Sequence, residues 1–113
     1  DLGGSIAGLW HGGTPVLRST EPEGLSSARQ AACYPLVPYS NRLAHRRFQW
    51  LGREYTTAPN FDDNPHSVHG VGWLRQWALV SRQEAQAELC YQHVPDAHWP
   101  FAFEARQRFT LTA

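Results

Sequence analysis

The chain has 113 residues, and its ten arginines balance ten aspartate and glutamate residues, so that the formal net charge is zero and no lysine is present. This is the length of about one domain, enough to bury an apolar core without metals or disulfides. Phosphate backbones and anionic membrane surfaces attract a basic excess that this chain lacks. Nucleic acids and membranes are therefore not expected as partners.

The cysteines and the two ends of the sequence say less about function. Cys33 and Cys90 are far apart and lack metal-ligand spacing, which predicts free thiols in a reducing cytoplasm and no metal or other cofactor. No apolar run approaches the roughly 20 residues that span a bilayer, and no leader pattern precedes Asp1. The absence of methionine and the strand-like start at Leu2 predict a sequence clipped at its front and its end.

The first predicted element is a hairpin. Ile6 to Trp10 and Thr14 to Leu17 flank His11-Gly12-Gly13, whose glycines suit the positive φ of a tight turn. Ser19 to Gln30 is rich in turn-forming residues and is predicted to be a loop with one helical turn near Leu25 to Arg29.

A strand from Cys33 to Val37 is predicted next, at an edge or irregular, because Pro35 and Pro38 cannot donate ladder hydrogen bonds. A second hairpin follows, with strands Arg47 to Trp50 and Arg53 to Tyr55 around Leu51-Gly52. The stretch from Ala58 to Gly72 is predicted to be a long surface connection, and it carries His66 and His69.

The last part of the chain has the clearest strand pattern. Ala87, Leu89 and Tyr91 alternate with polar residues, and from Phe101 to Leu111 the apolar residues again share one parity. This predicts an all-β antiparallel fold, a sandwich or barrel, with residues 1–113 as a single partial domain. Open sheet edges predict self-association.

Aromatic residues have two interpretations. Trp50 and Trp77 lie on apolar strand faces and are predicted to be core residues, whereas Trp73, in a glycine-rich approach to a strand, is predicted to be exposed for stacking on a sugar ring. His93, Asp96 and His98 surround Pro95 and predict a polar turn, with a site rim as the alternative.

Three polar residues could carry chemistry. The guanidinium of Arg42 and the amide of Asn41 suit vicinal sugar hydroxyls, and His69 can hydrogen-bond an oxygen or exchange a proton near neutrality. On chemistry alone, a turn residue, a surface ion pair and a solvated histidine are the commoner interpretations. A metal site from His66, His69 and Asp62-Asp63 is a weaker alternative, because zinc needs more ligands and a supporting shell.

The order of several segments resembles the aldose 1-epimerase (galactose mutarotase) family, in its N-terminal portion. The segments are Gly3-Gly4-Ser5-Ile6-Ala7, Tyr34-Pro35-Leu36-Val37-Pro38-Tyr39-Ser40-Asn41-Arg42, Phe48-Gln49-Trp50-Leu51-Gly52, Asn60, His69-Gly70, Trp77 and Trp99-Pro100-Phe101-Ala102-Phe103.

The resemblance implies part of an antiparallel β-sandwich of the galactose mutarotase type, a supersandwich, and an isomerase of carbohydrate metabolism that interconverts α and β hexose anomers. Asn41, Arg42, His69 and Trp73 are implied to bind the hexose, and His69 could also assist as an acid. The family's acid histidine, in a His-x-Tyr-Phe-like motif, and its base glutamate lie farther along, and neither motif is found here. The 113 residues alone are therefore predicted to be inactive.

Two alternatives remain open. A hexose-6-phosphate 1-epimerase relative would place an arginine soon after His69-Gly70, where this chain has Trp73, with Arg75 two residues on. A noncatalytic carbohydrate-binding β-sandwich, or a structural fragment, is the alternative outside enzymes.

Overall fold

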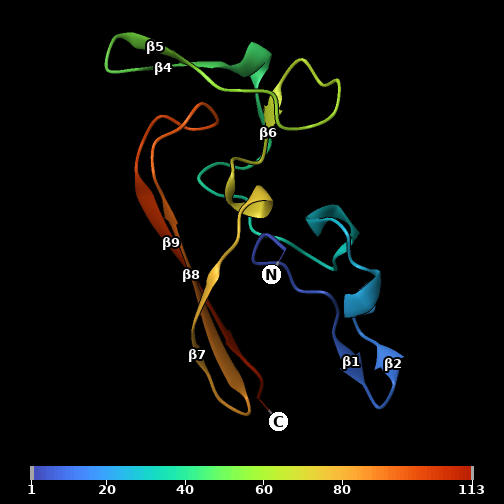
Figure 1. The fold of residues 1–113 in the computed structure, drawn as a ribbon. Coiled ribbons are helices and arrows are strands. Elements are labelled where there is room, and N and C mark those ends of the chain that lie inside the picture. The colour runs from blue at the N-terminus through green and yellow to red at the C-terminus, as the bar shows by residue number, and fades with distance from the viewer. Residues whose placement is uncertain (1, 113) are drawn as a thin grey trace.

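The computed structural model describes residues 2–112 as an elongated all-β molecule of 52 × 29 × 21 Å (Figure 1). Only short 3₁₀ helices interrupt the strands in this part of the chain, and none is long and apolar enough to cross a membrane. The strands are β1 (Trp10–His11), β2 (Thr14–Pro15), β3 (Arg42–Leu43), β4 (Arg47–Trp50), β5 (Arg53–Thr56), β6 (Ser67–Val68), β7 (Ala78–Arg82), β8 (Gln86–His93) and β9 (Phe103–Thr110). The 3₁₀ helices are η1 (Pro22–Gly24), η2 (Ala28–Gln30), η3 (Ala44–Arg46) and η4 (Gly72–Leu74).

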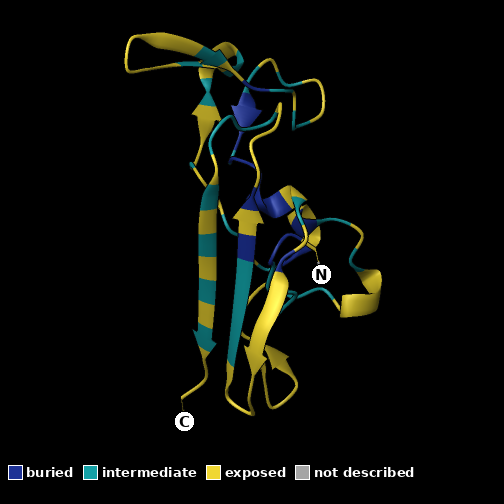
Figure 2. Cartoon of the chain, turned by 60° about the vertical axis from the view of Figure 1, so that its left-hand side comes forward, coloured by how far each residue is buried: buried dark blue, intermediate teal, exposed yellow. Residues whose placement is uncertain are grey.

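The largest sheet is the antiparallel sheet β7-β8-β9. In β9 half-buried and exposed residues alternate without a break, which gives the striped strand of Figure 2 and confirms the predicted period of two. The pattern in β8 is less regular because Glu88, on the polar parity, is covered by Arg106 and Arg108 at 2.9 and 3.2 Å. The β7 and β9 strands form the edges of this sheet, and self-association through them stays a prediction.

Both predicted hairpins are confirmed, the first in shortened form. β1 and β2 pair over two residues each, and Gly12 and Gly13 between them have φ of 56° and 79°. β4 and β5 pair over four residues each, with Leu51 and Gly52 at φ of 48° and 75°. The residues in between therefore adopt the left-handed conformation that two-residue hairpin turns require.

Two local predictions are wrong in detail. The stretch from Cys33 to Val37 is not a strand, because only Cys33 forms a bridge, to Ile6, and the prolines interrupt further pairing. The expected helical turn in Ser19 to Gln30 is replaced by two 3₁₀ turns, η1 and η2. The latter begins at a Ser27–Gln30 capping box.

The connection from Ala58 to Gly72 is not a surface loop throughout. β6 lies within it and pairs with β3, and Ser67, Val68, Gly70 and Val71 are buried. Sequence periodicity misses β3 and β6 because a two-residue strand is too short to show a period of two. This pairing places the residues around Asn41 beside those around His69.

The main core lies next to this connection, where η4 meets β8 and β9. Val71, Trp77 and Tyr91 form it, and Trp77 is 2 % exposed, as predicted. Trp50, also predicted to be core, is 56 % exposed because the β4–β5 hairpin packs only one face. The molecule exposes 7708 Å², more than the roughly 6,300 Å² typical of a compact monomer of its mass.

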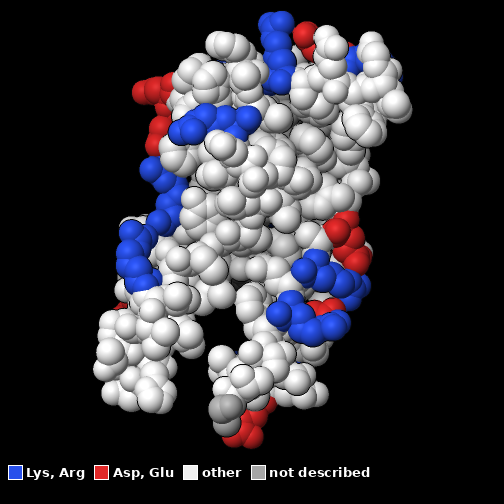
Figure 3. Space-filling view, turned by 180° about the vertical axis from the view of Figure 1, so that it is seen from behind, with Lys and Arg blue, Asp and Glu red and all other residues white. Residues whose placement is uncertain are grey.

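An open, largely apolar cleft indents the molecule. Its volume is about 640 Å³, and it separates the N-terminal segment around Ile6 and Leu9 from the ends of β8 and β9 around Leu89 and Phe109. Figure 3 shows an open notch between two lobes at the lower end of the molecule.

Candidate functional site

The β3–β6 pair brings together three of the four predicted site residues. Arg42 lies opposite Val68 in the antiparallel register. Asn41 and His69, the next residues on the two strands, therefore face each other at the same end of this short ladder. Asn41 and Arg42 are exposed, and His69 is half-buried. Residues 28 positions apart in the sequence thus share one accessible edge.

Asn41 and His69 hold each other through two hydrogen bonds. The Asn41 N–H donates to His69 Nδ1 at 3.0 Å, and the His69 N–H donates to the Asn41 carbonyl oxygen at 2.9 Å. An accepting Nδ1 carries no proton, so the neutral ring carries its proton on Nε2. His69 is therefore fixed as the tautomer that can donate a hydrogen bond from Nε2.

The charge state of His69 is biased in the same direction. Burial lowers the pKa of His69 below its ordinary value of 6.5, and the positive charge of Arg42 lowers it further. Arg42 itself donates to the Asn41 side-chain oxygen at 3.4 Å, a long contact. The edge thus presents a guanidinium, an amide and a neutral imidazole donor, a set that suits hydroxyl and ether oxygens.

Backbone strain is concentrated at this edge. Asn41 and His69 both have a φ of 62°, which few residues other than glycine adopt readily. Gly70 follows with a φ of 67°, and a side chain there would collide with the Val37 carbonyl oxygen. That oxygen accepts from the N–H groups of Val71 and Gly72 at 2.8 and 3.1 Å. The chain is therefore held tightly against the segment that precedes Asn41.

Asn60 is a residue that the sequence-based site prediction left out. Its side-chain nitrogen donates to the carbonyl oxygens of Val68 and Gly70 at 2.8 and 2.9 Å, and its oxygen accepts from the Val68 N–H at 2.8 Å. The available signal for Asn60 was its place among the segments that resemble the aldose 1-epimerases. No local sequence pattern shows that its side chain binds the backbone eight and ten residues further on.

Trp73 does not occupy the exposed position that was predicted for it. Its side chain is 6 % exposed, and its Nε1–H donates to the Val68 carbonyl oxygen at 3.3 Å. The indole packs against Tyr34, whose ring meets His69 edge-on at 6.4 Å. Trp73 thus lies behind His69 and cannot serve as an open stacking surface.

Tyr39 and a buried hydroxyl pair support the same segment. The Thr57 hydroxyl donates to the Ser67 hydroxyl at 2.7 Å, and both residues are buried. Burial raises the pKa of Tyr39 above 10.0, although hydrogen bonds with the Ser67 side chain and the Gly70 backbone act in the opposite direction. The phenol is therefore neutral at physiological pH.

The histidines and aspartates of the metal alternative are engaged separately. His66 Nδ1 accepts the His45 N–H at 2.9 Å, and Asp62 pairs with Arg29 at 2.8 Å. Among residues 2–112, the structure places no group of three or more histidine, cysteine, aspartate or glutamate side chains to hold a metal ion.

The predicted polar turn around Asp96 is confirmed. Asp96 Oδ1 accepts from the backbone N–H groups of His98 and Trp99, and its Oδ2 pairs with Arg75 at 2.8 Å. The neighbouring His93 is buried and bonds the Tyr91 hydroxyl at 2.7 Å and the Trp99 carbonyl oxygen at 2.9 Å. Arg75, the nearest arginine after His69-Gly70, is thus already paired with a carboxylate.

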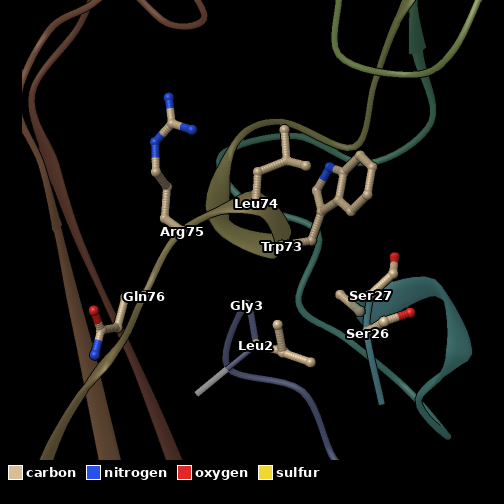
Figure 4. A pocket seen from close by; sticks show the side chains of 9 residues that line it. Leu2, Gly3, Ser26, Ser27, Trp73, Leu74, Arg75 and Gln76 are labelled. Carbon is tan, nitrogen blue, oxygen red and sulfur yellow. The ribbon is translucent and has the colours of Figure 1, made fainter. Parts of the chain in front are cut away.

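A pocket that opens to solvent lies beside η4. Its volume is about 240 Å³, and it lies between η4 and the N-terminal segment, with Leu2, Ser26, Ser27 and Trp73 in its lining (Figure 4). Arg75 points away from Leu2 and Ser26 in this view. Of the four predicted site residues, Trp73 lines this pocket, whereas Asn41, Arg42 and His69 do not.

Comparison with known proteins agrees with the fold. The family model described as aldose 1-epimerase matches residues 1–113. A crystal structure of a proposed aldose 1-epimerase from Escherichia coli K12 superposes with a TM-score of 0.86 at 39 % identity, over 97 % of this chain and 36 % of that one.

Two curated relatives come from the same organism. The uncharacterized protein YphB is 41 % identical over the whole chain, and the uncharacterized protein YihR is 23 % identical over 99 % of it. The chain spans 37 % and 36 % of these relatives' lengths.

The antiparallel strands, the solved neighbour and the family model together define an epimerase-type β-sandwich, of which this chain forms a part. The chain belongs to the aldose 1-epimerase family.

Proposed function

We propose that this chain carries the substrate-gripping part of a hexose site in an aldose 1-epimerase, an isomerase that interconverts α and β anomers by opening and reclosing the sugar ring. The observation that supports this most directly is the reciprocal Asn41–His69 hydrogen bonding beside exposed Arg42. It presents fixed donors on an accessible edge, as recognition of sugar oxygens requires.

In this proposal His69 acts mainly in binding. Its neutral Nε2–H donates to an oxygen of the sugar, while Arg42 and Asn41 bond neighbouring hydroxyls. A histidine whose pKa lies below 6.5 is mostly unprotonated at neutral pH, so it assists proton transfer rather than serving as the principal acid. Trp73 supports the site without contacting the sugar, by packing against Tyr34 and donating a hydrogen bond to the Val68 carbonyl oxygen.

Ring opening needs one proton removed from the anomeric hydroxyl and another delivered to the ring oxygen. We assign neither principal group to these 113 residues, which form one partial domain in this proposal. Residues 1–113 alone are expected to bind hexose without accelerating mutarotation, which polarimetry on the purified chain would test.

Hexose binding can be tested by calorimetric or NMR titration of glucose and galactose into the wild type and two variants. Arg42→Ala and His69→Asn should each weaken binding about tenfold or more, since asparagine tolerates the φ of 62° but lacks the imidazole. Arg53→Ala and His11→Asn, both at exposed hairpin positions, serve as matched controls. Unchanged affinity in both site variants would contradict the proposal.

A noncatalytic carbohydrate-binding surface is the second candidate, because Trp10 and Trp50 are 39 % and 56 % exposed. Exposed tryptophans can stack on sugar rings. If Trp50→Ala abolishes hexose binding while Arg42→Ala does not, this second candidate is favoured. A sugar phosphate is a less suitable ligand, because Asp96 already neutralises Arg75.

A further inference from the structure

Asn60 holds the two residues on either side of His69. All three of its hydrogen bonds go to the backbone of Val68 and Gly70, at 2.8 to 2.9 Å. A carboxamide offers two donor hydrogens and an accepting oxygen, and here both ends of the group are used. The side chain therefore acts as a substitute for a neighbouring strand.

Asn41 holds the same segment through its middle residue. The His69 N–H donates to the Asn41 carbonyl oxygen at 2.9 Å, between the backbone groups that Asn60 engages. Three successive residues, 68 to 70, are thus bonded alternately to Asn60 and Asn41. The position of the His69 backbone is fixed by both partners.

This constraint matters because the His69 backbone is strained. A φ of 62° in a residue other than glycine is unfavourable and persists only where the surroundings enforce it. The backbone dihedrals set the direction in which the His69 side chain leaves the chain, and it is from this conformation that Nδ1 accepts the Asn41 N–H at 3.0 Å.

We propose that Asn60 is a positioning residue for the hexose site: its carboxamide fixes the backbone around His69 and thereby holds the imidazole as the Nε2–H donor. Asn60 needs no contact with the sugar for this role. The inference rests on the proposed function for its purpose, but the geometry it predicts exists without any sugar.

The decisive measurement is therefore made without ligand, on the intact chain. Imidazole ¹⁵N chemical shifts report the tautomer and the pKa of His69 in the wild type, in Asn60→Asp and in Asn60→Ala. Asn60→Asp keeps the size and the accepting oxygen but loses both donors. Asn64→Asp is the matched control, since Asn64 lies in the same connection and its side-chain oxygen accepts the His66 N–H, a bond that aspartate can also accept.

We expect wild type and Asn64→Asp to show His69 as the Nε2–H tautomer. Both Asn60 variants should show a mixture of tautomers, faster exchange of the His69 amide hydrogen, and a His69 pKa closer to the unperturbed 6.5. A folded Asn60 variant with the wild-type tautomer, pKa and amide exchange would overturn the inference, whatever its change in thermal stability.

A wild-type measurement covers the case in which the variants do not fold. Through-hydrogen-bond couplings from the Asn60 side-chain nitrogen to the carbonyl carbons of Val68 and Gly70 should be detectable, and the Asn60 amide hydrogens should exchange slowly. Free exchange of these hydrogens would contradict the inference. Absence of hexose binding by the wild type would instead contradict the proposed function and leave the His69 result standing.

Discussion

Asn41 and His69, 28 residues apart in sequence, form two hydrogen bonds with each other. The Asn41 N–H donates to His69 Nδ1 at 3.0 Å, and the His69 N–H donates to the Asn41 carbonyl oxygen at 2.9 Å. The first bond uses the Nδ1 lone pair, which protonation would occupy. Proton uptake by His69 therefore breaks a contact that fixes the site, and this adds to the effects of burial and of the Arg42 charge.

The first prediction concerns pH. Because the pKa of His69 is lowered in the folded state, its contribution to stability is complete above the unfolded value of about 6.5 and is lost as pH falls through the lower folded value. Hexose affinity should fall over the same range. An NMR titration should give a His69 midpoint below 6.5, and Arg42→Gln should raise it. A wild-type midpoint above 6.5 would be inconsistent with this geometry.

The second prediction separates collision from backbone strain. Gly70 and Gly52 have similar φ, 67° and 75°, but an added Cβ meets the Val37 carbonyl at Gly70 and nothing within 4 Å at Gly52. Gly52→Ala should lower the free energy of unfolding by about 1 kcal/mol, and Gly70→Ala by about 3 kcal/mol or more. Urea denaturation measures both. Equal losses would show that the contact with Val37 relaxes at little cost.

The sequence predicts the long strands and the hairpins well, because alternation and glycine-containing turns are local signals. β9 and the turn at Leu51-Gly52 are examples. It also predicts Asn41, Arg42 and His69 as site candidates through the family resemblance, and the structure places them together, although their roles remain proposals.

What the sequence does not predict depends on contacts between distant residues. The β3–β6 ladder is too short for periodicity, and the role of Asn60 exists only once residues 68 to 70 lie beside it. Burial of tryptophans is the clearest failure: Trp50 and Trp73 have local patterns that predict the reverse of their exposures, 56 % and 6 %. Whether another segment covers a strand face is not a local property.

The third prediction uses this contrast. Trp77 is 2 % exposed, packs on Tyr91 and donates its Nε1–H to the Gly72 carbonyl oxygen at 2.9 Å. Trp77→Phe removes this hydrogen bond and part of the packed volume, so it should cost about 2 kcal/mol of stability. Trp50→Phe should change stability by less than about 0.5 kcal/mol. A similar cost for both, measured by urea denaturation, would contradict the described core.

The fourth prediction concerns the turn that joins β8 to β9. Burial acts to raise the pKa of Asp96, but hydrogen bonds from Arg75 and from the backbone of His98 and Trp99 outweigh it, so the pKa lies below the ordinary 3.8. A lowered carboxyl pKa stabilises the fold above the unfolded value, and this contribution is lost as pH falls through the folded value.

Asp96→Asn should therefore weaken the dependence of stability on pH below about 4 and lower stability at pH 7 by about 1 kcal/mol, because Arg75 loses its carboxylate partner. Glu54→Gln is the control, since Glu54 pairs with Arg47 at 3.5 Å and both side chains are more than half exposed. Thermal unfolding of the wild type and both variants between pH 3 and pH 7 makes the comparison. If Asp96→Asn loses stability at acidic pH in the same way as the wild type, another carboxyl group dominates the acid dependence of stability.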